Sequence, residues 1–446
     1  MHTLQPDWIL TPEGLRSDWA ITVQSGTIVD VGPAERHREI HERAHGLLLV
    51  PGFVNAHSHA FQRAFRGHVQ WKRTPEDDFW SWRQTMYSMA NSLPPEGIFA
   101  VSRLAFLEML EAGITEVGEF HYVHHQPDGT PYSNPNELAH QVIAAAVDVG
   151  IRICLLRVAY ARSGFKQAPN PLQKRFINRT PEDVLQAVTL LREQNFGPLV
   201  RIGLAPHSVR AVPEHWLNVF AGFDGPIHMH VSEQPAENEQ CESEYGLSPT
   251  ALLAEKGLLH SLFTAVHMTH PKQGDAALFA QSGAQVCVCP TTELDLGDGF
   301  LPTSVKQSAK LCVGTDSHSQ IDIMMECRAL ELHARALEGS RNVLAPVAEP
   351  NGLALRLLEA GTTSGRHALG GVGRGLEAGA PADITGIQLR KTGAMGVPPL
   401  QALVFVSNPD WVTDVWVHGE RVVRQGLHSR RTQVIEAALP WLHRQQ

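Results

Sequence analysis

Two histidines one residue apart, His57 and His59, are the side chains in this chain best placed to do chemistry. They follow the short apolar run 51–56, which is typical of a strand. Residues i and i+2 of an extended strand point to the same face, so both imidazoles could bind one metal ion. Histidine is the commonest protein metal ligand, and its neutral ring nitrogen suits Zn²⁺, Fe²⁺ or Mn²⁺. The pair therefore predicts half of a metal site.

The side chains that could complete this site occupy equivalent places in the sequence, since each lies at the end of a later apolar run or just after it. They are His207, Arg210, His228, His230, Glu233, His267 and Asp316. We assign His230 and Asp316 as the remaining ligands. His228 and His230 are two residues apart and would face the same side of a strand, so the alternation of side chains cannot choose between them as ligand. We prefer His230 because it lies nearer the end of its apolar run.

Three neutral histidines and one carboxylate can hold Zn²⁺ at about 2.0–2.2 Å and leave one position for water. The metal lowers the pKa of that water towards about 7, which makes a nucleophile available at neutral pH. Hydrolysis then needs a base or electrostatic group beside the water and an acid beside the leaving group. We expect His267 to fill the first role and Glu233 the second.

Short β-branched runs alternate with longer helical segments between residues 51 and 366, which favours an α/β fold with a parallel sheet. Eight such strands over about 300 residues are typical of a (β/α)₈ TIM-like barrel, which places its chemistry at the carboxyl ends of the strands. The expected strands are 52–56, 114–120, 151–157, 200–205, 226–231, 263–268, 284–289 and 311–315, and helices are expected at 95–112, 137–149, 181–193 and 250–255.

The two ends of the chain are rich in short strand-like runs at 19–32, 382–387, 402–406 and 412–423. Neither end can bury a core alone, so we expect both to form one small β-sandwich domain. The alternative is two separate β appendages. The expected domains are 1–50 and 367–446 for the β-sandwich and 51–366 for the barrel.

The segment after the first barrel strand is long and aromatic, with Trp71, Phe79, Trp80, Trp82 and Tyr87. An insertion at this end of a barrel is positioned to roof an active site.

Composition excludes several classes of function. The formal net charge is -9 and no lysine- or arginine-rich run occurs, so nucleic acid is not an expected partner. No apolar run reaches the roughly 18 residues of a membrane span, and the N-terminus does not resemble a secretory signal. Six scattered cysteines indicate neither a disulfide framework nor a CxxC zinc site. We therefore expect a cytoplasmic protein with no membrane partner.

Together these residues resemble the amidohydrolase superfamily. The resemblance rests on the stretch 51–59, on Gly314-Thr-Asp-Ser-His318, on the later histidines and on the two-ended β domain. His207 stands where binuclear members carry a bridging Lys or Glu, which favours the mononuclear deaminase branch. Further motifs at 57–64, 79–83, 119–125, 207–212, 230–234 and 296–299 resemble the formimidoylglutamate deiminases within that branch.

The resemblance implies hydrolysis of N-formimino-L-glutamate to N-formyl-L-glutamate and ammonia, a step of histidine degradation. It implies one divalent metal ion per subunit, Zn²⁺ with Fe²⁺ as the alternative, and a homodimer. It carries the metal ligands onto His57, His59, His230 and Asp316, the catalytic pair onto Glu233 and His267, and substrate contacts onto Gln62, Arg83, Tyr122, His207 and Arg210. In the implied mechanism Asp316 also receives a proton.

A dicarboxylate substrate needs fixed cations, and Arg83 and Arg210 can supply bidentate recognition. Glu293 and Asp295 follow the seventh strand, and either would alter the charge of the pocket if it pointed inward.

Two alternatives stay open. Another mononuclear deaminase, acting on a purine, pterin or thio-adenosine compound, would place aromatic stacking groups and few arginines in the pocket. A metal-free structural member that acts by oligomerisation would have lost ligands that this chain retains.

Overall fold

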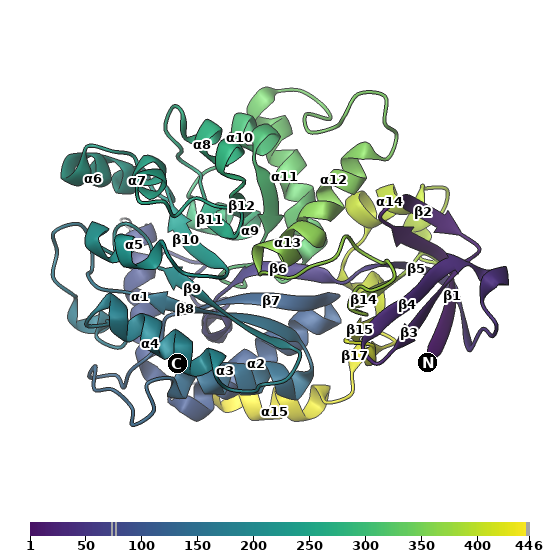
Figure 1. Cartoon of the computed structure of the whole chain (residues 1–446), viewed down its shortest axis with the longest axis horizontal. Coiled ribbons are helices and arrows are strands. Elements are labelled where there is room, and N and C mark those ends of the chain that lie inside the picture. The colour runs from purple at the N-terminus through teal and green to yellow at the C-terminus, as the bar shows by residue number, and fades with distance from the viewer. Residues whose placement is uncertain (73–74, 76–77, 443–446) are drawn as a thin grey trace.

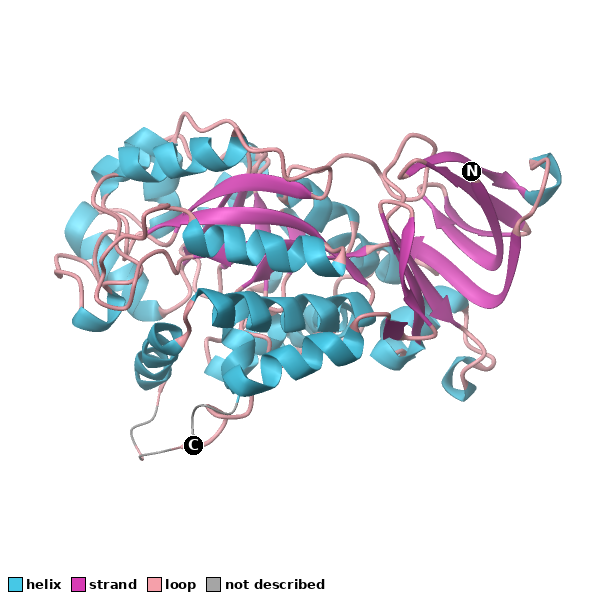
Figure 2. Ribbon diagram, turned by 90° about the horizontal axis from the view of Figure 1, so that it is seen from below, coloured by secondary structure: helices cyan, strands magenta, loops and turns pink. Residues whose placement is uncertain are grey.

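The computed structural model describes residues 1–72, 75 and 78–442, and the side chain of Trp80 lies outside this description. Figure 1 shows two parts: a sheet wrapped by helices, and beside it a smaller lobe of strands that includes the N-terminus. In Figure 2 the helices surround the strands of the larger part, and few cover the smaller one.

The larger part is built on an eight-stranded parallel sheet whose strands follow one another in chain order. Its strands are β6 Phe53–Ser58, β7 Ile114–His121, β8 Arg152–Ala159, β9 Val200–Pro206, β10 Ile227–Val231, β11 Phe263–His267, β12 Gln285–Val288 and β13 Lys310–Val313. This confirms the predicted barrel. Most strand residues are buried, because helices cover the outer face and side chains fill the inside.

The barrel closes through the residues of the predicted metal site. Beyond β13, the Asp316 N–H donates to the carbonyl of His57 at 3.0 Å, and the His59 N–H donates to the carbonyl of Asp316 at 3.1 Å. Gly314 permits this contact, since a Cβ there would lie 2.8 Å from both the Cβ and the carbonyl oxygen of His57. Barrel closure therefore sets His57, His59 and Asp316 in register.

The helices around the sheet begin where capping residues and prolines predict. The Thr180 side chain caps α4, with Pro181 in its first turn, and the Ser248 side chain caps α7 in the same way. The larger helices are α2 Pro95–Glu111, α3 Glu137–Val149, α4 Pro181–Arg192, α6 Pro235–Tyr245, α8 Asp275–Ser282, α11 Ile323–Glu338 and α12 Gly352–Ala360. The shorter ones include α5 Glu214–Phe220, α7 Pro249–Glu255, α9 Pro290–Leu296, α10 Thr303–Ser308 and α13 Thr363–Ala368.

The aromatic segment after β6 folds as the 3₁₀ turn η2 Ala60–Phe65 and the helix α1 Phe79–Ser92. Phe79, Trp82 and Tyr87 lie beside the site residues, as expected of a roof, whereas Trp71 is exposed.

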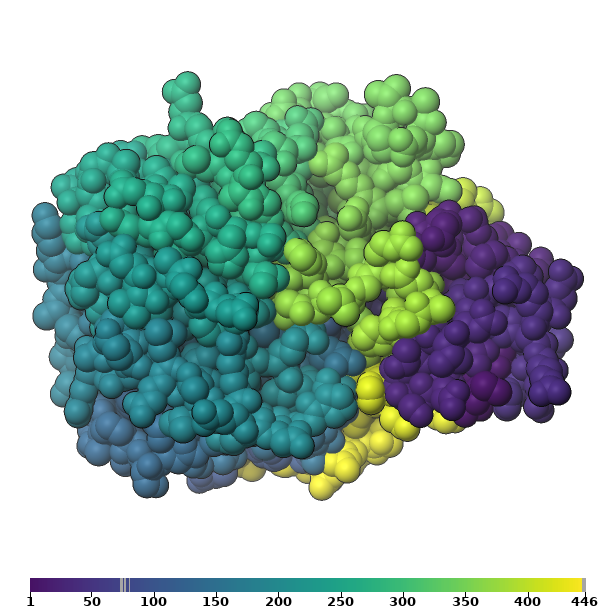
Figure 3. All heavy atoms as spheres, viewed as in Figure 1, coloured from purple at the N-terminus to yellow at the C-terminus, as the bar shows by residue number. Residues whose placement is uncertain are grey.

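The smaller part is one mixed sheet of nine strands from both chain ends. The N-terminal end supplies β1 His2–Thr11, β2 Gly14–Ser17, β3 Trp19–Gln24, β4 Thr27–Pro33 and β5 Glu42–Pro51, and the C-terminal end supplies β14 Ile384–Gln388, β15 Val412–Val417, β16 Glu420–Arg424 and β17 Leu427–His428. Antiparallel pairing of β5 with β14 joins the two ends, which confirms a single β domain. In the space-filling view of Figure 3 the N-terminal residues form this lobe, with C-terminal residues at its edge.

The strands of this domain belong to one continuous sheet that curls around its own core rather than to two separate sheets. The Ile28 N–H donates to the carbonyl of Ala380, just before β14, so the β4 edge contacts the middle of the sheet. The separate hydrophobic cluster inside includes Ile9, Ile21, Leu49 and Ile384.

One expectation about the C-terminal end is wrong. Residues 402–406 form a π-helical turn, η5 Ala402–Val406, instead of a strand. The last helix, α15 Arg431–Leu442, packs on α2 of the barrel, where Trp441 contacts Gly97. The chain therefore returns to the barrel after completing the β domain. Among the described residues no helix is long and apolar enough to cross a membrane.

Candidate metal centre and active site

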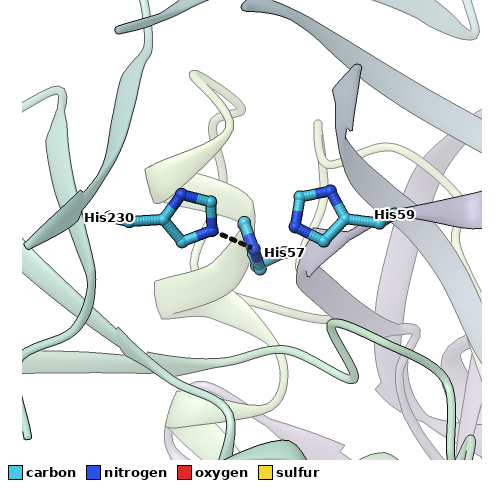
Figure 4. Close-up of side chains that lie close together, drawn as sticks. All are labelled: His57, His59 and His230. Carbon is cyan, nitrogen blue, oxygen red and sulfur yellow. Dashed lines mark hydrogen bonds between the residues drawn. The ribbon is translucent and has the colours of Figure 1, made fainter. Parts of the chain in front are cut away.

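The predicted metal ligands converge at the carboxyl ends of β6 and β10. Ligand atoms of His57, His59 and His230 lie within 4.8 Å of one another, and all three side chains are buried. Figure 4 shows the three rings facing a common centre. The Nε2 atoms of His57 and His230 lie 3.3 Å apart.

Hydrogen bonds behind the rings fix which nitrogen faces that centre. Nδ1 of His59 donates to the carbonyl of Phe120 at 3.0 Å, and Nδ1 of His230 donates to the carbonyl of His207 at 3.0 Å. In a neutral imidazole this leaves the Nε2 lone pair free and aimed inward. Burial favours the neutral form, since it lowers the pKa of His57 to about 3 and holds the pKa of His230 well below its usual value.

Asp316 completes the group from the turn after β13. Its Oδ1 lies 3.5 Å from Nε2 of His57 and 3.3 Å from Nε2 of His59. Burial would raise the pKa of this carboxyl, but the hydrogen bond with His57 and the charge of His267 hold it well below its usual range. Lone pairs of imidazoles and a carboxylate that face one another need a cation between them, so these residues fit a divalent metal.

His228 takes a different direction. Its Nε2 donates to the carbonyl of Ala368 at 2.9 Å, deeper in the barrel. The structure thus brings His230 rather than His228 to the ligand group.

His267, at the end of β11, lies among three carboxylates. Its Nδ1 is 3.3 Å from Oε1 of Glu293, and its Nε2 is 3.7 Å from both Oε1 of Glu233 and Oδ2 of Asp316. Burial would lower the pKa of His267, but the hydrogen bond to Glu293 and the three charges raise it to about 10. A charged imidazolium suits the electrostatic role better than that of a base.

The backbone at these strand ends adopts left-handed conformations that non-glycine residues rarely take. Ser232, His267, Met268, Asp316 and His318 have φ between 44° and 77°. Each costs of order 1 kcal/mol and persists only where the surroundings impose it. The clustering of such residues around one centre is typical of a functional site.

Glu233 and Arg210 form a buried ion pair beside this centre. Nη2 of Arg210 donates to Oε2 of Glu233 at 2.6 Å, and Nε of Arg210 lies 2.9 Å from Oε2 of Glu237. Burial opposes the charge of Arg210, but Glu237 and Glu233 raise its pKa above the usual value. Its Nη1 is buried without a hydrogen-bond partner among the described residues.

The predicted substrate residues share one small cavity with the ligands. Nε2 of Gln62 donates to the hydroxyl of Tyr122 at 3.0 Å, and Nη2 of Arg83 donates to the hydroxyl of Tyr160 at 2.7 Å. The cavity volume is about 40 Å³, and its lining comprises His59, Gln62, Phe79, Trp82, Arg83, Met86, Tyr87, Tyr122, Tyr160, His207, Arg210, His230, Glu233, Leu296 and Asp316. The structure therefore brings together the five predicted substrate residues, the proton donor and three of the four ligands.

Glu293 and Asp295, the two acids that follow the seventh strand, do not add charge to the pocket lining. Glu293 is fully buried behind His267, where its Oε1 also accepts the Cys289 N–H at 2.8 Å. Asp295 is exposed and accepts from Gln70 at 3.0 Å. Glu293 thus holds the ring of His267 from behind.

A buried polar network supports the ligand strand. The Ser58 hydroxyl donates to Glu119 at 2.5 Å and lies 3.0 Å from Nε2 of His318. Nδ1 of His318 lies 3.0 Å from the hydroxyl of Thr315, which accepts from Asn55 at 2.7 Å. These residues immobilise the backbone that carries His57, His59 and Asp316. Asn55, Ser58, Thr315 and His318 lie within two residues of a ligand in the sequence, whereas no local sequence pattern connects Glu119 with the site.

Comparison with known proteins places this geometry in context. The sequence profile of the Amidohydrolase family matches residues 48–422. The formimidoylglutamate deiminase of Pseudomonas aeruginosa is 36% identical over 443 residues, which cover 96% of each chain. A 5-methylthioadenosine/S-adenosylhomocysteine deaminase of Teredinibacter turnerae is 27% identical and covers 95% of this chain and 92% of its own. A crystal structure of an amidohydrolase from Brucella melitensis superposes with a TM-score of 0.92 at 35% identity and covers 99% of both chains.

Proposed function

Because this chain belongs to the amidohydrolase family, we propose that it hydrolyses N-formimino-L-glutamate to N-formyl-L-glutamate and ammonia. The observation that carries the proposal is the presence of two guanidinium groups, Arg83 and Arg210, in the cavity that also contains His59, His230 and Asp316. A substrate with two carboxylates and a hydrolysable C–N bond matches this combination of fixed positive charge and metal ligands.

The metal in this proposal is one divalent cation, Zn²⁺, held by His57, His59, His230 and Asp316, and Fe²⁺ is the alternative. Three histidines and one carboxylate form a donor set suited to zinc. When bound there, the cation would act as a Lewis acid and lower the pKa of a water molecule.

The protein side chains orient the substrate around that centre. Nη1 of Arg210 and Oε1 of Gln62 are buried without hydrogen-bond partners among the described residues, so both can bind substrate without first losing a partner. Arg83 and Arg210 hold the carboxylates, and Gln62, Tyr122 and His207 line the path to the formimino carbon. Because these contacts hold the reacting carbon in a fixed position, the carbon and the attacking water do not need to meet by diffusion.

Glu233 moves the proton in this account. Its Oε1 faces His267 and its Oε2 faces Arg210, so it lies between the metal ligands and the substrate-binding cations. The attacking water supplies the oxygen of the formyl group and gives up two protons. Asp316 and Glu233 accept these protons and pass them to the imino nitrogen, with Glu233 as the direct donor, and the nitrogen leaves as ammonia. His267, held by Glu293, offsets negative charge at Asp316 and Glu233 during this transfer.

The cavity of about 40 Å³ is much smaller than pockets that hold a ligand of this size. Phe79, Trp82, Arg83, Met86 and Tyr87 of α1 form its roof. We therefore expect α1 to shift outward when substrate enters.

A second candidate is deamination of 5-methylthioadenosine or a related purine, which the aromatic Phe79 and Trp82 in the lining favour. Ammonia release from N-formimino-L-glutamate, N-formimino-L-aspartate and 5-methylthioadenosine, measured side by side, separates the two. We expect release from the formimino dicarboxylates, with the glutamate derivative preferred. Release from the thio-adenosine compound alone would overturn the proposal.

A further inference from the structure

A second group of possible metal ligands lies next to the first. Ligand atoms of His267, Cys289 and Asp316 lie within 4.8 Å of one another, and all three residues are buried. They come from the ends of three neighbouring strands: β11, β12 and, through the turn that follows it, β13. Only Asp316 belongs to both groups.

Hydrogen bonding leaves one nitrogen of this group without a partner. Nδ1 of His267 faces Glu293 at 3.3 Å, which turns Nε2 towards Oδ2 of Asp316 at 3.7 Å. This Nε2 is buried and makes no hydrogen bond among the described residues. Such an orphaned polar atom is costly unless another group satisfies it.

The chemical types of these three side chains determine which cation they can bind. A thiolate, an imidazole and a carboxylate suit borderline or soft cations such as Zn²⁺ and Cd²⁺, whereas Mg²⁺ and Ca²⁺ prefer oxygen ligands alone. Cys289 belongs to a small buried cluster with Ala56, Val266 and Ala368, and its sulfur lies within 4.8 Å of the ligand atoms of His267 and Asp316.

We propose that His267, Cys289 and Asp316 bind a second, thiophilic divalent cation, and that this cation inhibits the enzyme. On binding, the Cys289 thiol and Nε2 of the His267 imidazolium each release a proton to solvent. The sulfur and this nitrogen then each donate an electron pair to the cation, without oxidation or reduction. The cation occupies His267 and shares Asp316, both of which the proposed reaction uses. Inhibition therefore rests on the proposed function, whereas binding of the cation does not.

The two groups differ in the number of metal-binding side chains, and this difference determines which site binds a metal ion first. The first group offers three histidines and Asp316, and the second offers two donors of its own plus the shared carboxylate. We expect the second cation to bind only at excess Zn²⁺ or Cd²⁺, and to leave first when a chelator is added.

The test is metal titration of the zinc-loaded enzyme, with equilibrium dialysis for stoichiometry and ultraviolet absorption for thiolate-to-cadmium charge transfer. The variants are Cys289→Ala, the near-isosteric Cys289→Ser, and Cys312→Ala as the matched control. Cys312 is a buried thiol of the same cluster that lies outside the ligand group. Activity in the absence of excess metal is expected to be the same in all four proteins.

For the wild type and Cys312→Ala we expect a second bound ion, a charge-transfer band and inhibition that a chelator reverses. For both Cys289 variants we expect no band, affinity for the second ion weaker by about 100-fold, and no inhibition at the same metal concentration. Absence of the second ion in the wild type, or its persistence with a charge-transfer band in the Cys289 variants, would overturn the proposal. If N-formimino-L-glutamate is not hydrolysed, the proposed function fails, but stoichiometry and the band still decide the second site.

Discussion

Arg210 donates from Nη2 to Oε2 of Glu233 at 2.6 Å, so a predicted substrate-binding cation is paired with the predicted proton donor. A substrate carboxylate that binds Arg210 must share this guanidinium with Glu233. Glu237 stabilises the arrangement, because its Oε2 lies 2.9 Å from Nε of Arg210 and its Oε1 accepts the Ser232 N–H at 3.0 Å. Recognition of substrate and delivery of the proton are therefore physically linked.

Replacement of Glu237 by Gln tests this link. The variant keeps the size of the side chain but removes the charge that holds Arg210, so we expect KM for N-formimino-L-glutamate to rise about tenfold, or about 1.4 kcal/mol, with a smaller loss in kcat. The control is Glu239→Gln, an exposed position on the same helix. An unchanged KM in Glu237→Gln, or an equal change in both variants, would contradict the role of Glu237.

Replacement of Glu233 by Gln separates proton transfer from metal binding. Glu233 is not among the four predicted ligands, so the variant should retain its metal. We expect turnover to fall by about two orders of magnitude or more, the range typical of a lost general acid. Steady-state kinetics and metal analysis on one preparation provide the measurement. Normal turnover in this variant would remove the proposed role.

His230→Ala and His228→Gln distinguish two histidines that have the same parity on β10. His230 faces the ligand group, whereas His228 donates to the carbonyl of Ala368. We expect His230→Ala to lose metal and activity together, and His228→Gln to retain both. Metal retention in His230→Ala with normal turnover would show that the ligand group has been assigned wrongly.

Lys306 on α10 gives a prediction about stability and pH. It is fully buried, and its Nζ has no hydrogen-bond partner among the described residues. Burial lowers its pKa from 10.5 to about 8. Below pH 8 the folded protein bears the cost of a buried charge. Between pH 8 and 10.5 the unfolded chain binds a proton that the folded protein lacks, so wild-type stability rises with pH.

The variant Lys306→Met removes this charge. We expect its free energy of unfolding to exceed that of the wild type by up to about 3 kcal/mol at neutral pH. The difference should shrink as pH rises above 8 towards 10.5. Urea unfolding midpoints at several pH values measure it. A variant that is less stable at neutral pH, or a difference that does not change with pH, would contradict this account.

The barrel and the positions of its site residues could be predicted from the sequence because each barrel strand carries a β-branched or apolar run. At the end of such a run the apolar side chains give way to a histidine or an acidic residue, as at His57, His267 and Asp316. The observed strands differ from the expected ones by a few residues at their ends, since boundaries depend on hydrogen bonds rather than on side-chain type. The roles of these residues in catalysis stay predictions.

The π-helical turn at Ala402–Val406 could not be distinguished from a strand by its sequence, Ala-Leu-Val-Phe-Val. A short apolar run suits a buried strand and a buried helix equally well. The preceding Pro398 and Pro399 begin the short helix α14 Pro399–Gln401, which continues into this turn. Packing of this segment against the rest of the protein decides between strand and helical turn, and the local sequence holds no information about that packing.

Contacts between distant residues were the part of the site that the sequence could not provide. Glu293 holds His267 across 26 residues, and Ser58 contacts His318 across 260. Glu237 follows Glu233 by four residues, but its pairing with Arg210 depends on the turn at Ser232 and on the approach of the strand β9 loop. Such contacts require the folded barrel.

Ammonia release from N-formimino-L-glutamate, measured on one preparation before metal removal, after removal and after reloading with Zn²⁺, tests the central claim most directly. We expect activity to disappear with the metal and to return in proportion to zinc bound, up to one ion per chain. Activity that is unchanged in the metal-free protein, or a zinc-loaded protein that releases no ammonia from this substrate, would contradict the account.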